Sequence, residues 1–140
     1  MALLSRKSLL AVAAVIDVAL YGRDRPVSAK ALAARHSLPA RHLEPVLQAL
    51  VRMGILKGIR GPRGGYELAR DRRRITADEI LRAAGTVEEL EGPPMPASAL
   101  LASVVVPALA QAEQAFATAL GRINVEDMAR GAESLPGLQG

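Results

Sequence analysis

The segment Ile59-Arg60-Gly61-Pro62-Arg63-Gly64-Gly65-Tyr66 decides how the rest of the chain is interpreted. Residues 61–65 combine three glycines with a proline, which is the chemistry of a tight turn, and Arg63 stands at its tip. Residues 55–60 before the turn and residues 66–69 after it are too short for helices and can form two strands. The segment predicts a small β-hairpin with a basic tip, although an ordinary solvated hairpin fits the same pattern.

Two short helices joined by a turn precede the hairpin. The first of them opens at Val27-Ser28, where Ser28 can cap free amide groups, and it ends near His36. The second runs from about Ala40 to Met53 and stops at Gly54. Its inward face recurs at three- and four-residue steps and comprises Leu43, Val46, Leu47, Leu50 and Val51. Helix, turn, helix and hairpin in this order predict a winged helix-turn-helix, a mainly α fold with a small β-hairpin wing.

An apolar stripe marks a further helix near the N-terminus, which Gly22 ends. The stripe comprises Leu9, Val12, Ala13, Ile16 and Leu20. Asp17 interrupts the apolar run that follows Arg6 and Lys7, and the run is too short to span a bilayer. The pattern favours a buried helix over a secretory signal. We therefore expect a cytoplasmic protein with no membrane partner.

Charge divides the chain into two parts. The first 75 residues hold fifteen Lys and Arg against five Asp and Glu, a net charge of +10, and the last 65 hold three against nine, a net charge of −6. A positive region attracts phosphate and gains free energy from released counterions. The chain has only three aromatic residues, too few for the stacking platforms of single-strand binders, so duplex DNA is the predicted partner. The sequence shows no nucleophile-base pair, no carboxylate dyad and no phosphate-binding loop, so it gives no indication of an enzyme.

The C-terminal part predicts an interaction element. We assign residues 1–86 to the winged helix-turn-helix domain, 87–96 to a Pro-rich linker, 97–130 to a dimerisation helix region and 131–140 to a flexible tail. The stripe expected at the dimer interface comprises Leu101, Val105, Ala108, Ala112, Phe116 and Ala119. Pairing with a second copy is favoured over packing within one monomer, because a domain of this size already has its own core and small residues allow helices to approach closely. Pro107 should break or kink the long helix near Ser103.

Several stretches together resemble the IscR/NsrR type of bacterial winged-helix transcription regulators. The resemblance rests on residues 5–7, 43–47, 54–56, 60–69 and 75–80, and it returns faintly at residues 123–128. It implies a homodimeric DNA-binding regulator, usually a repressor, whose third helix enters the major groove and whose wing enters the adjacent minor groove. Many members carry three cysteines that hold an iron-sulfur cluster. This chain has no cysteine, so we expect no cluster and no cofactor.

The expected DNA contacts combine the residues with the resemblance. Arg41, His42 and Glu44 match the base-facing part of the third helix, because arginine can donate twice to guanine and a carboxylate can accept from cytosine. Arg63 at the wing tip can enter a narrow minor groove. The complete set of expected DNA-contacting residues is Arg6, Lys7, Ser28, Arg41, His42, Glu44, Arg60, Pro62, Arg63, Gly64 and Gly65.

Several assignments stay open from the sequence alone. Pro45 cannot donate a backbone hydrogen bond, which leaves the bases that are read undecided. His42 fits a groove contact or a plain surface position, His36 fits a helix end, and their spacing matches no metal site. Residues 70–74 form a solvated loop or anchor phosphate. Thr76 and Glu79 have the spacing of a capping box.

Two functions remain in competition. The first is a dimeric, sequence-specific transcription regulator, and the second is a winged-helix protein-protein interaction module without specific DNA readout. The concentration of arginine near the wing favours the first, because a protein-binding module has no need of it. An effector could be a small molecule or a protein, or there could be none, and the sequence does not name the operator.

Overall fold

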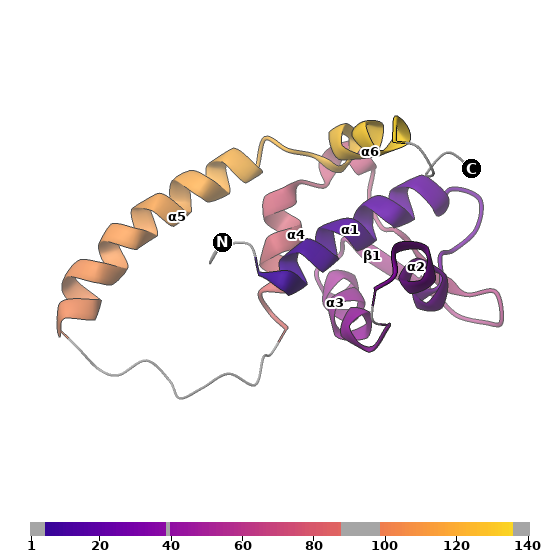
Figure 1. The fold of residues 1–140 in the computed structure, drawn as a ribbon, viewed down its shortest axis with the longest axis horizontal. Helices are drawn as coiled ribbons and strands as arrows, with labels where there is room; N and C mark the ends of the chain where they lie inside the picture. Colours follow the sequence, from indigo (N-terminus) through magenta and orange to yellow (C-terminus); the bar gives the residue numbers. More distant parts are fainter. Residues whose placement is uncertain (1–4, 39, 88–98, 136–140) are drawn as a thin grey trace.

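The computed structural model describes residues 5–38, 40–87 and 99–135 of the 140-residue chain. Helices predominate, and a single pair of strands interrupts them within these residues (Figure 1). The elements are α1 (Arg6–Tyr21), α2 (Ala29–His36), α3 (Ala40–Arg52), β1 (Leu56–Ile59), β2 (Gly65–Leu68), the 3-10 turn η1 (Arg72–Arg74), α4 (Ala77–Ala84), the π-helical turn η2 (Leu101–Val105), α5 (Val106–Leu120) and α6 (Val125–Glu133). The order confirms the predicted helix-turn-helix followed by a wing.

The helix ends follow from capping residues in the sequence. Ser5 Oγ accepts a hydrogen bond from the Ser8 amide at 3.2 Å at the start of α1, and Ser28 Oγ accepts one from the Ala31 amide at 3.0 Å at the start of α2. Gly54 takes a positive φ of 76° two residues beyond the end of α3. The predicted cap at Ser28 and stop at Gly54 are therefore confirmed.

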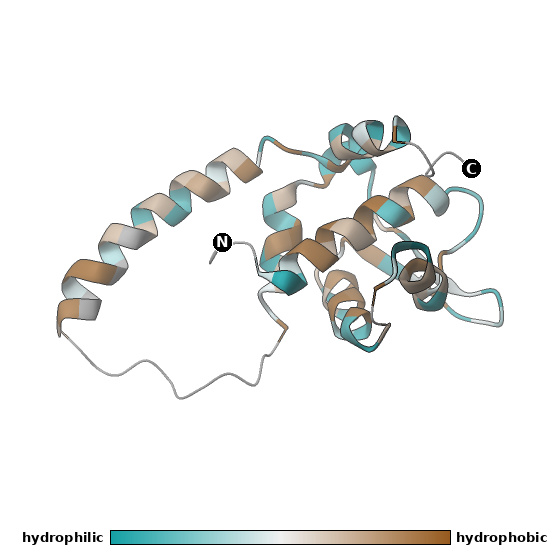
Figure 2. Ribbon diagram, in the orientation of Figure 1, coloured by the Kyte–Doolittle hydropathy of each residue, from teal (hydrophilic) through white to brown (hydrophobic). Residues whose placement is uncertain are grey.

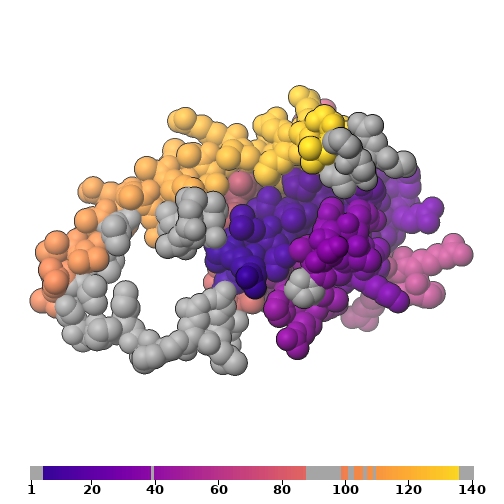
Figure 3. Space-filling model, viewed as in Figure 1, coloured from indigo at the N-terminus to yellow at the C-terminus, as the bar shows by residue number. Residues whose placement is uncertain are grey.

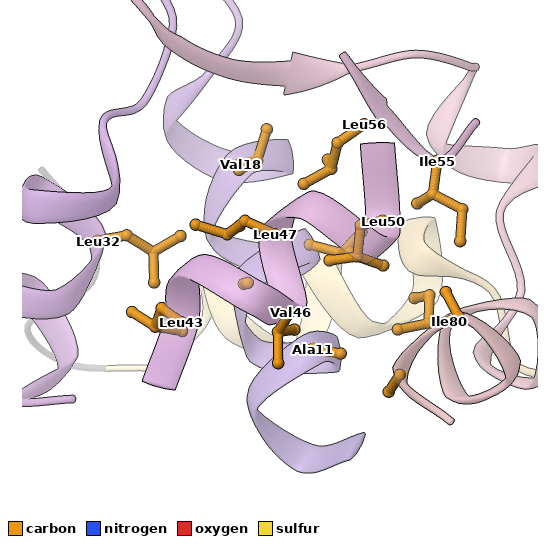
Figure 4. Packing of buried hydrophobic residues seen from close by; sticks show 14 of the residues in the cluster. Ala11, Val18, Leu32, Leu43, Val46, Leu47, Leu50, Ile55, Leu56 and Ile80 are labelled. Carbon is orange, nitrogen blue, oxygen red and sulfur yellow. The ribbon is translucent and has the colours of Figure 1, made fainter. Parts of the chain in front are cut away.

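The helix α3 lies at the centre of the hydrophobic core (Figure 4). Leu43, Leu47 and Leu50 on its inner edge are each 0% exposed. They pack among side chains of α1, α2 and α4, with Leu32 of α2 and Ile80 of α4 visible on either side. Each leucine buried in this way stabilises the fold by about 1.5–3 kcal/mol. This burial fixes which edge of α3 faces outward.

The wing is an antiparallel hairpin held to the helical part by its main chain. Its register runs from Leu56 opposite Leu68 to Ile59 opposite Gly65. Outside the hairpin, the Val27 amide donates to the Tyr66 carbonyl at 2.9 Å and the Tyr66 amide donates to the Val27 carbonyl at 2.8 Å. This two-bond bridge attaches the wing to the residue that precedes the cap of α2.

A buried carboxylate joins α1 to the end of α2. Asp17 is 1% exposed, and both of its oxygens accept hydrogen bonds from the Arg35 guanidinium at 3.1 and 3.2 Å. His36 Nε2 lies 2.6 Å from the same carboxylate, which agrees with its expected place at a helix end. The Arg35 guanidinium also lies 4.0 Å from the centre of the Tyr21 ring, within reach of a cation-π contact. Asp17, which breaks the apolar pattern in the sequence, therefore connects two helices.

The last helix returns to the body of the domain. Val125 and Ala129 of α6 are 0% exposed and lie against α1. The Ala77 amide donates to the Ile123 carbonyl at 2.8 Å, and the Val125 amide donates to the Ile75 carbonyl at 2.9 Å. The core of the winged helix-turn-helix domain thus includes residues well beyond the boundary expected at residue 86.

An ion-pair cluster fastens α6 from the outside. Arg72 lies 2.6 Å from Glu126 and 3.7 Å from Glu133, and it donates to the Ala19 carbonyl at 3.3 Å. Burial by itself would raise the pKa of Glu126, but the charges of Arg72 and Arg130 hold that pKa below its ordinary value. The helix α6 continues to Glu133, past residue 131 where a tail was expected; residues 136–140 lie outside the described part.

The helix α5 extends away from the body of the domain and carries mostly apolar or neutral side chains (Figures 1 and 2). Along its predicted stripe Ala108, Ala112 and Ala119 are exposed, and Val105 and Phe116 are half-buried. The π-helical turn η2 stands where Pro107 was expected to disturb α-helical bonding. Across the described residues, no helix combines the length and apolar character needed to cross a bilayer. The expected linker lies largely within residues 88–98, outside the described part.

The capping box predicted for α4 is wrong, although the helix begins where it was expected. Thr76 is the residue before α4, but its hydroxyl makes no capping bond and donates instead to the Asp78 carboxylate. Glu79 pairs with Arg70 at 2.7 Å. Thr76 therefore bonds to Asp78 and Glu79 bonds to Arg70, and neither side chain makes the reciprocal backbone bonds of a capping box.

We predict that Asp17→Asn destabilises the fold. The amide cannot balance the charge of Arg35, so the free energy of unfolding should fall by about 2–3 kcal/mol, as when a hydrogen-bonded buried charge pair is broken. Urea denaturation of the two proteins measures the difference. Asp24→Asn, in the exposed loop after α1, is the matched control and should change stability by less than about 0.5 kcal/mol. An unaltered midpoint for Asp17→Asn would contradict the proposed connection.

Candidate nucleic-acid interface

The helices α2 and α3 and the wing lie on one side of the domain, and α6 lies on the opposite side (Figure 1). The space-filling view shows the same separation, with the purple surface of α2 and α3 below and the yellow surface of α6 above (Figure 3). The elements expected to contact DNA therefore share a side.

The outward edge of α3 presents polar side chains at helical spacing. Arg41, Glu44 and Gln48 are all exposed, and they are separated by three and four residues, so they lie along one edge. Pro45 is also exposed there and offers no side-chain hydrogen bond. Because Leu43 and Leu47 are buried on the opposite edge, α3 cannot turn these side chains inward.

One flank of α3 meets the start of α1. A hollow of about 260 Å³ between the two helices is lined by Arg6, Lys7, Arg41 and His42, over an apolar floor that includes Leu10. Lys7 Nζ donates to the Val87 carbonyl at 2.6 Å, so part of its hydrogen-bonding capacity is used inside the domain.

The positive charge at this flank is otherwise available to a ligand. Arg6, Arg41 and His42 are exposed, and their side chains have no hydrogen-bond or ion-pair partner among the residues that the structure describes. The exposed, unpaired guanidinium groups of Arg6 and Arg41 suit a phosphate backbone, and the His42 ring can add a hydrogen bond beside them. The four residues expected from the sequence on α1 and the start of α3 are thus brought together.

The other flank of α3 meets the wing. A second hollow, of about 520 Å³, separates α3 from the hairpin and is lined by Gln48, Arg60 and Tyr66. The Gln48 amide lies beside the Tyr66 side chain in this hollow and acts to lower the pKa of its hydroxyl. Burial, and next the charge of Glu44, raise the pKa of Tyr66 above 10.0, so its hydroxyl stays protonated at neutral pH. Sequence analysis missed Gln48 and Tyr66 as site residues, because only their spatial proximity reveals them.

A third and larger hollow, of about 890 Å³, lies between the wing tip and the loop before α2. Arg63 and Pro62 line it from the wing, and Arg25 and Ser28 line it from the loop and the helix cap. Arg25 and Arg63 are exposed and have no side-chain partner within the described residues. Arg25 was also missed, because a lone arginine in a loop carries no sequence signal of its own.

The wing glycines are required by the protein's own backbone. Gly61 has a φ of 116°, and the Gly64 amide donates to the Gly61 carbonyl at 2.9 Å, which closes the turn. A Cβ atom on Gly64 would collide with the Ile59 carbonyl, and one on Gly65 would collide with the Val27 carbonyl. These contacts give the glycines a structural role beyond the tight turn that the sequence predicts.

The basic run after the wing divides into two groups. Arg70 pairs with Glu79 at 2.7 Å, and Arg72 is held by the acidic side chains of α6. Arg73 and Arg74 are exposed. Arg70 and Arg72 are thus paired within the domain, which neither alternative left open for residues 70–74, a solvated loop or a phosphate anchor, included.

A helix-turn-helix and wing with unpaired arginines on one side define a winged-helix DNA-binding protein. The sequence model of the Rrf2 family, described as an iron-dependent transcriptional regulator, matches residues 4–131. The chain therefore belongs to the Rrf2 family, whose members are transcription regulators and not enzymes. The resemblance read from the wing and α3 is confirmed.

Individual relatives support the same assignment. A Synechocystis protein provisionally named HTH-type transcriptional regulator slr0846 is 37% identical over 142 residues, covering 98% of this chain and 94% of the relative. The regulator IscR of Xenorhabdus nematophila is 36% identical over 80 residues, covering 57% of this chain and 49% of its own length. The solved structure of T. potens IscR shares 32% identity with a TM-score of 0.72, covering 97% of this chain and 92% of that one.

The residues of this chain do not fit an iron-sulfur cluster bound by thiolates. The sequence contains no cysteine, which removes the ligand that such clusters require. Among the residues with described positions, no three or more His, Asp or Glu side chains gather as metal ligands. No step of the proposed function is therefore assigned to iron.

We predict that Gly65→Ala weakens the attachment of the wing. Its new methyl group would overlap the Val27 carbonyl, so the bridge to the helical part should open or shift at a cost of about 1–3 kcal/mol, and DNA affinity should fall. Thermal unfolding and DNA titration measure the two effects. Gly58→Ala is the matched control in the same hairpin, because a methyl group there meets no atom within 4 Å. Equal behaviour of the two variants would count against the bridge.

Proposed function

We propose that this Rrf2-family protein is a homodimeric, sequence-specific DNA-binding repressor that acts in the cytoplasm without an iron-sulfur cluster. The observation that carries the proposal is the placement of unpaired cations on both flanks of α3. Arg6 and Arg41 lie on the flank beside α1, Arg60 lies on the flank beside the wing, and Arg63 lies at the wing tip. An interface for protein partners would not require such a distribution of positive charge.

The arrangement fits duplex DNA in one orientation. The outward edge of α3, with Arg41, His42 and Glu44, enters the major groove, where each base pair presents a distinct set of donors and acceptors. The wing then reaches the adjacent minor groove with Arg63, and Arg60 and Arg25 lie near the phosphates between them. Ser28 at the α2 cap and the backbone at Pro62, Gly64 and Gly65 complete the contact.

The dimer is proposed to form through α5. This helix extends from the body and exposes an alanine-rich stripe, which allows another helix to approach closely. Leu101, Val105, Ala108, Ala112, Phe116 and Ala119 are the proposed contacts. Two-fold pairing would place the two α3 helices about 34 Å apart, one turn of DNA, and would select a pseudo-palindromic operator.

Repression follows from occupancy of such an operator. A dimer bound over a promoter excludes the polymerase, and release from DNA restores transcription. Because the chain has no cysteine, the proposed alternatives are release by a small molecule, release by a protein partner, or no effector at all.

The first test is DNA binding itself. Fragments of the source genome that the protein selects should share a palindromic site, and affinity for that site should fall steeply with salt as counterions are released. Arg63→Ala should weaken binding to every duplex, and Arg41→Ala should additionally cost about 1–3 kcal/mol of base preference. Fluorescence anisotropy on specific and random duplexes separates the two effects.

A matched control and two clear outcomes complete this test. Arg122→Ala removes an exposed arginine from the turn after α5 and should leave binding unchanged. Salt-independent affinity, or arginine variants that bind as the parent does, would reject the DNA-facing assignment. Capture of a protein in place of DNA would instead favour the interaction module.

The second test is the oligomeric state. Val105→Glu places a charge in the proposed helix pair, where burial without a partner is unfavourable, so the dimer should dissociate. Light scattering gives the mass directly. Gln114→Glu introduces the same charge at an exposed position on the opposite edge of α5 and should remain dimeric. If Val105→Glu is still a dimer, the interface lies elsewhere.

A further inference from the structure

Tyr66 is the residue at which the wing, the α2 segment and α3 meet. Its main chain forms both hydrogen bonds of the bridge to Val27, at 2.8 and 2.9 Å, and it also pairs across the hairpin with Gly58. Its side chain is half-buried, packs against the core and lines the hollow beside Gln48. A residue anchored by its backbone in the wing thus places its hydroxyl beside α3.

The neighbouring edge of α3 carries two polar side chains one helical turn apart. Glu44 and Gln48 are both exposed; Gln48 lines the same hollow as Tyr66, and the charge of Glu44 raises the pKa of the Tyr66 hydroxyl. Since the hydroxyl stays protonated, it can donate to one neighbour and accept from the other. The Tyr66 side chain on the wing is therefore placed where it can orient the Gln48 amide.

The composition of α3 makes Gln48 more important for hydrogen bonding to bases. Pro45, at the centre of the outward edge, has neither a side-chain donor nor an acceptor, so base readout falls to the residues around it. A glutamine amide offers two donors and two acceptor lone pairs. A hydrogen bond to Tyr66 would use one of these four sites and leave a donor and an acceptor, which is the pair that matches the N7 and N6 edge of adenine.

We propose that Gln48 is a specificity-determining residue that reads an adenine in each half-site, and that Tyr66 is the positioning residue that orients its amide. The proposal rests on the proposed DNA-binding function. It adds a residue that reads bases from the side of α3 nearest the wing. It also makes the wing part of base readout in the major groove, because the wing holds the side chain that makes the contact.

Four proteins test the assignment on a selected operator and on its single-base variants: the parent, Gln48→Ala, Tyr66→Phe and the double variant. Gln48→Ala should lose roughly tenfold of preference at one A·T pair in each half-site, the scale of one bidentate base contact. Tyr66→Phe should lose a smaller factor at that same pair. The double variant should equal Gln48→Ala, because the hydroxyl acts only through the amide.

Three readouts distinguish positioning from a loss of structure. Tyr66→Phe keeps the ring and the backbone bridge, so its thermal midpoint and its affinity for random duplex should match those of the parent. Gln48→Glu should not restore the preference, because a carboxylate lacks the N–H donor that adenine N7 requires. Ser134→Ala removes a hydroxyl at the end of α6, on the side of the domain opposite α3 and the wing, and should leave the base preference intact.

The outcomes separate this proposal from the broader one. If the parent prefers an operator but Gln48→Ala discriminates every base pair as the parent does, the assignment of Gln48 is overturned. If Gln48→Ala relaxes one position and Tyr66→Phe relaxes none, the positioning role is overturned. If the parent shows no sequence preference, both this proposal and the proposed function fail.

Discussion

The burial of one edge of α3 is the constraint on which the rest of the molecule depends. Leu43, Leu47 and Leu50 are fully excluded from solvent, and at about 1.5–3 kcal/mol each their burial outweighs any single surface contact. A helix fixed in this way has no freedom to rotate about its axis. Hydrophobic packing on the opposite edge therefore keeps Arg41 and Gln48 facing outward. The same packing makes the candidate interface rigid.

The same structure sorts the positive charges of the N-terminal part into two sets. Arg35 and Arg72 are held by acidic partners and connect helices to one another. Arg6, Arg41 and Arg63 have no such partner among the described residues and face solvent beside α3 and the wing. A basic sequence alone does not distinguish these sets. The pairing pattern identifies which arginines are available to a polyanion and which stabilise the fold.

This chain belongs to the Rrf2 family although it lacks the thiolate ligands of an iron-sulfur cluster. The family is described as iron-dependent, yet this chain lacks every cysteine. The features that support DNA binding are the core of α3, the Val27–Tyr66 bridge and the wing turn, and none of them needs a thiolate. The winged helix-turn-helix can therefore be retained while the sensing chemistry differs, because the two depend on different residues.

The sequence by itself determined the helix-turn-helix, the wing and most candidate contacts, because caps, turn glycines and three- and four-residue apolar steps are local signals. The sequence predicted a capping box that does not form, because Glu79 pairs with Arg70. It also did not predict that α6 packs against the core. Arg25, Gln48 and Tyr66 could be recognised only in three dimensions. Local patterns fix which elements form, whereas contacts between residues distant in sequence are decided by which surfaces the packed core brings together.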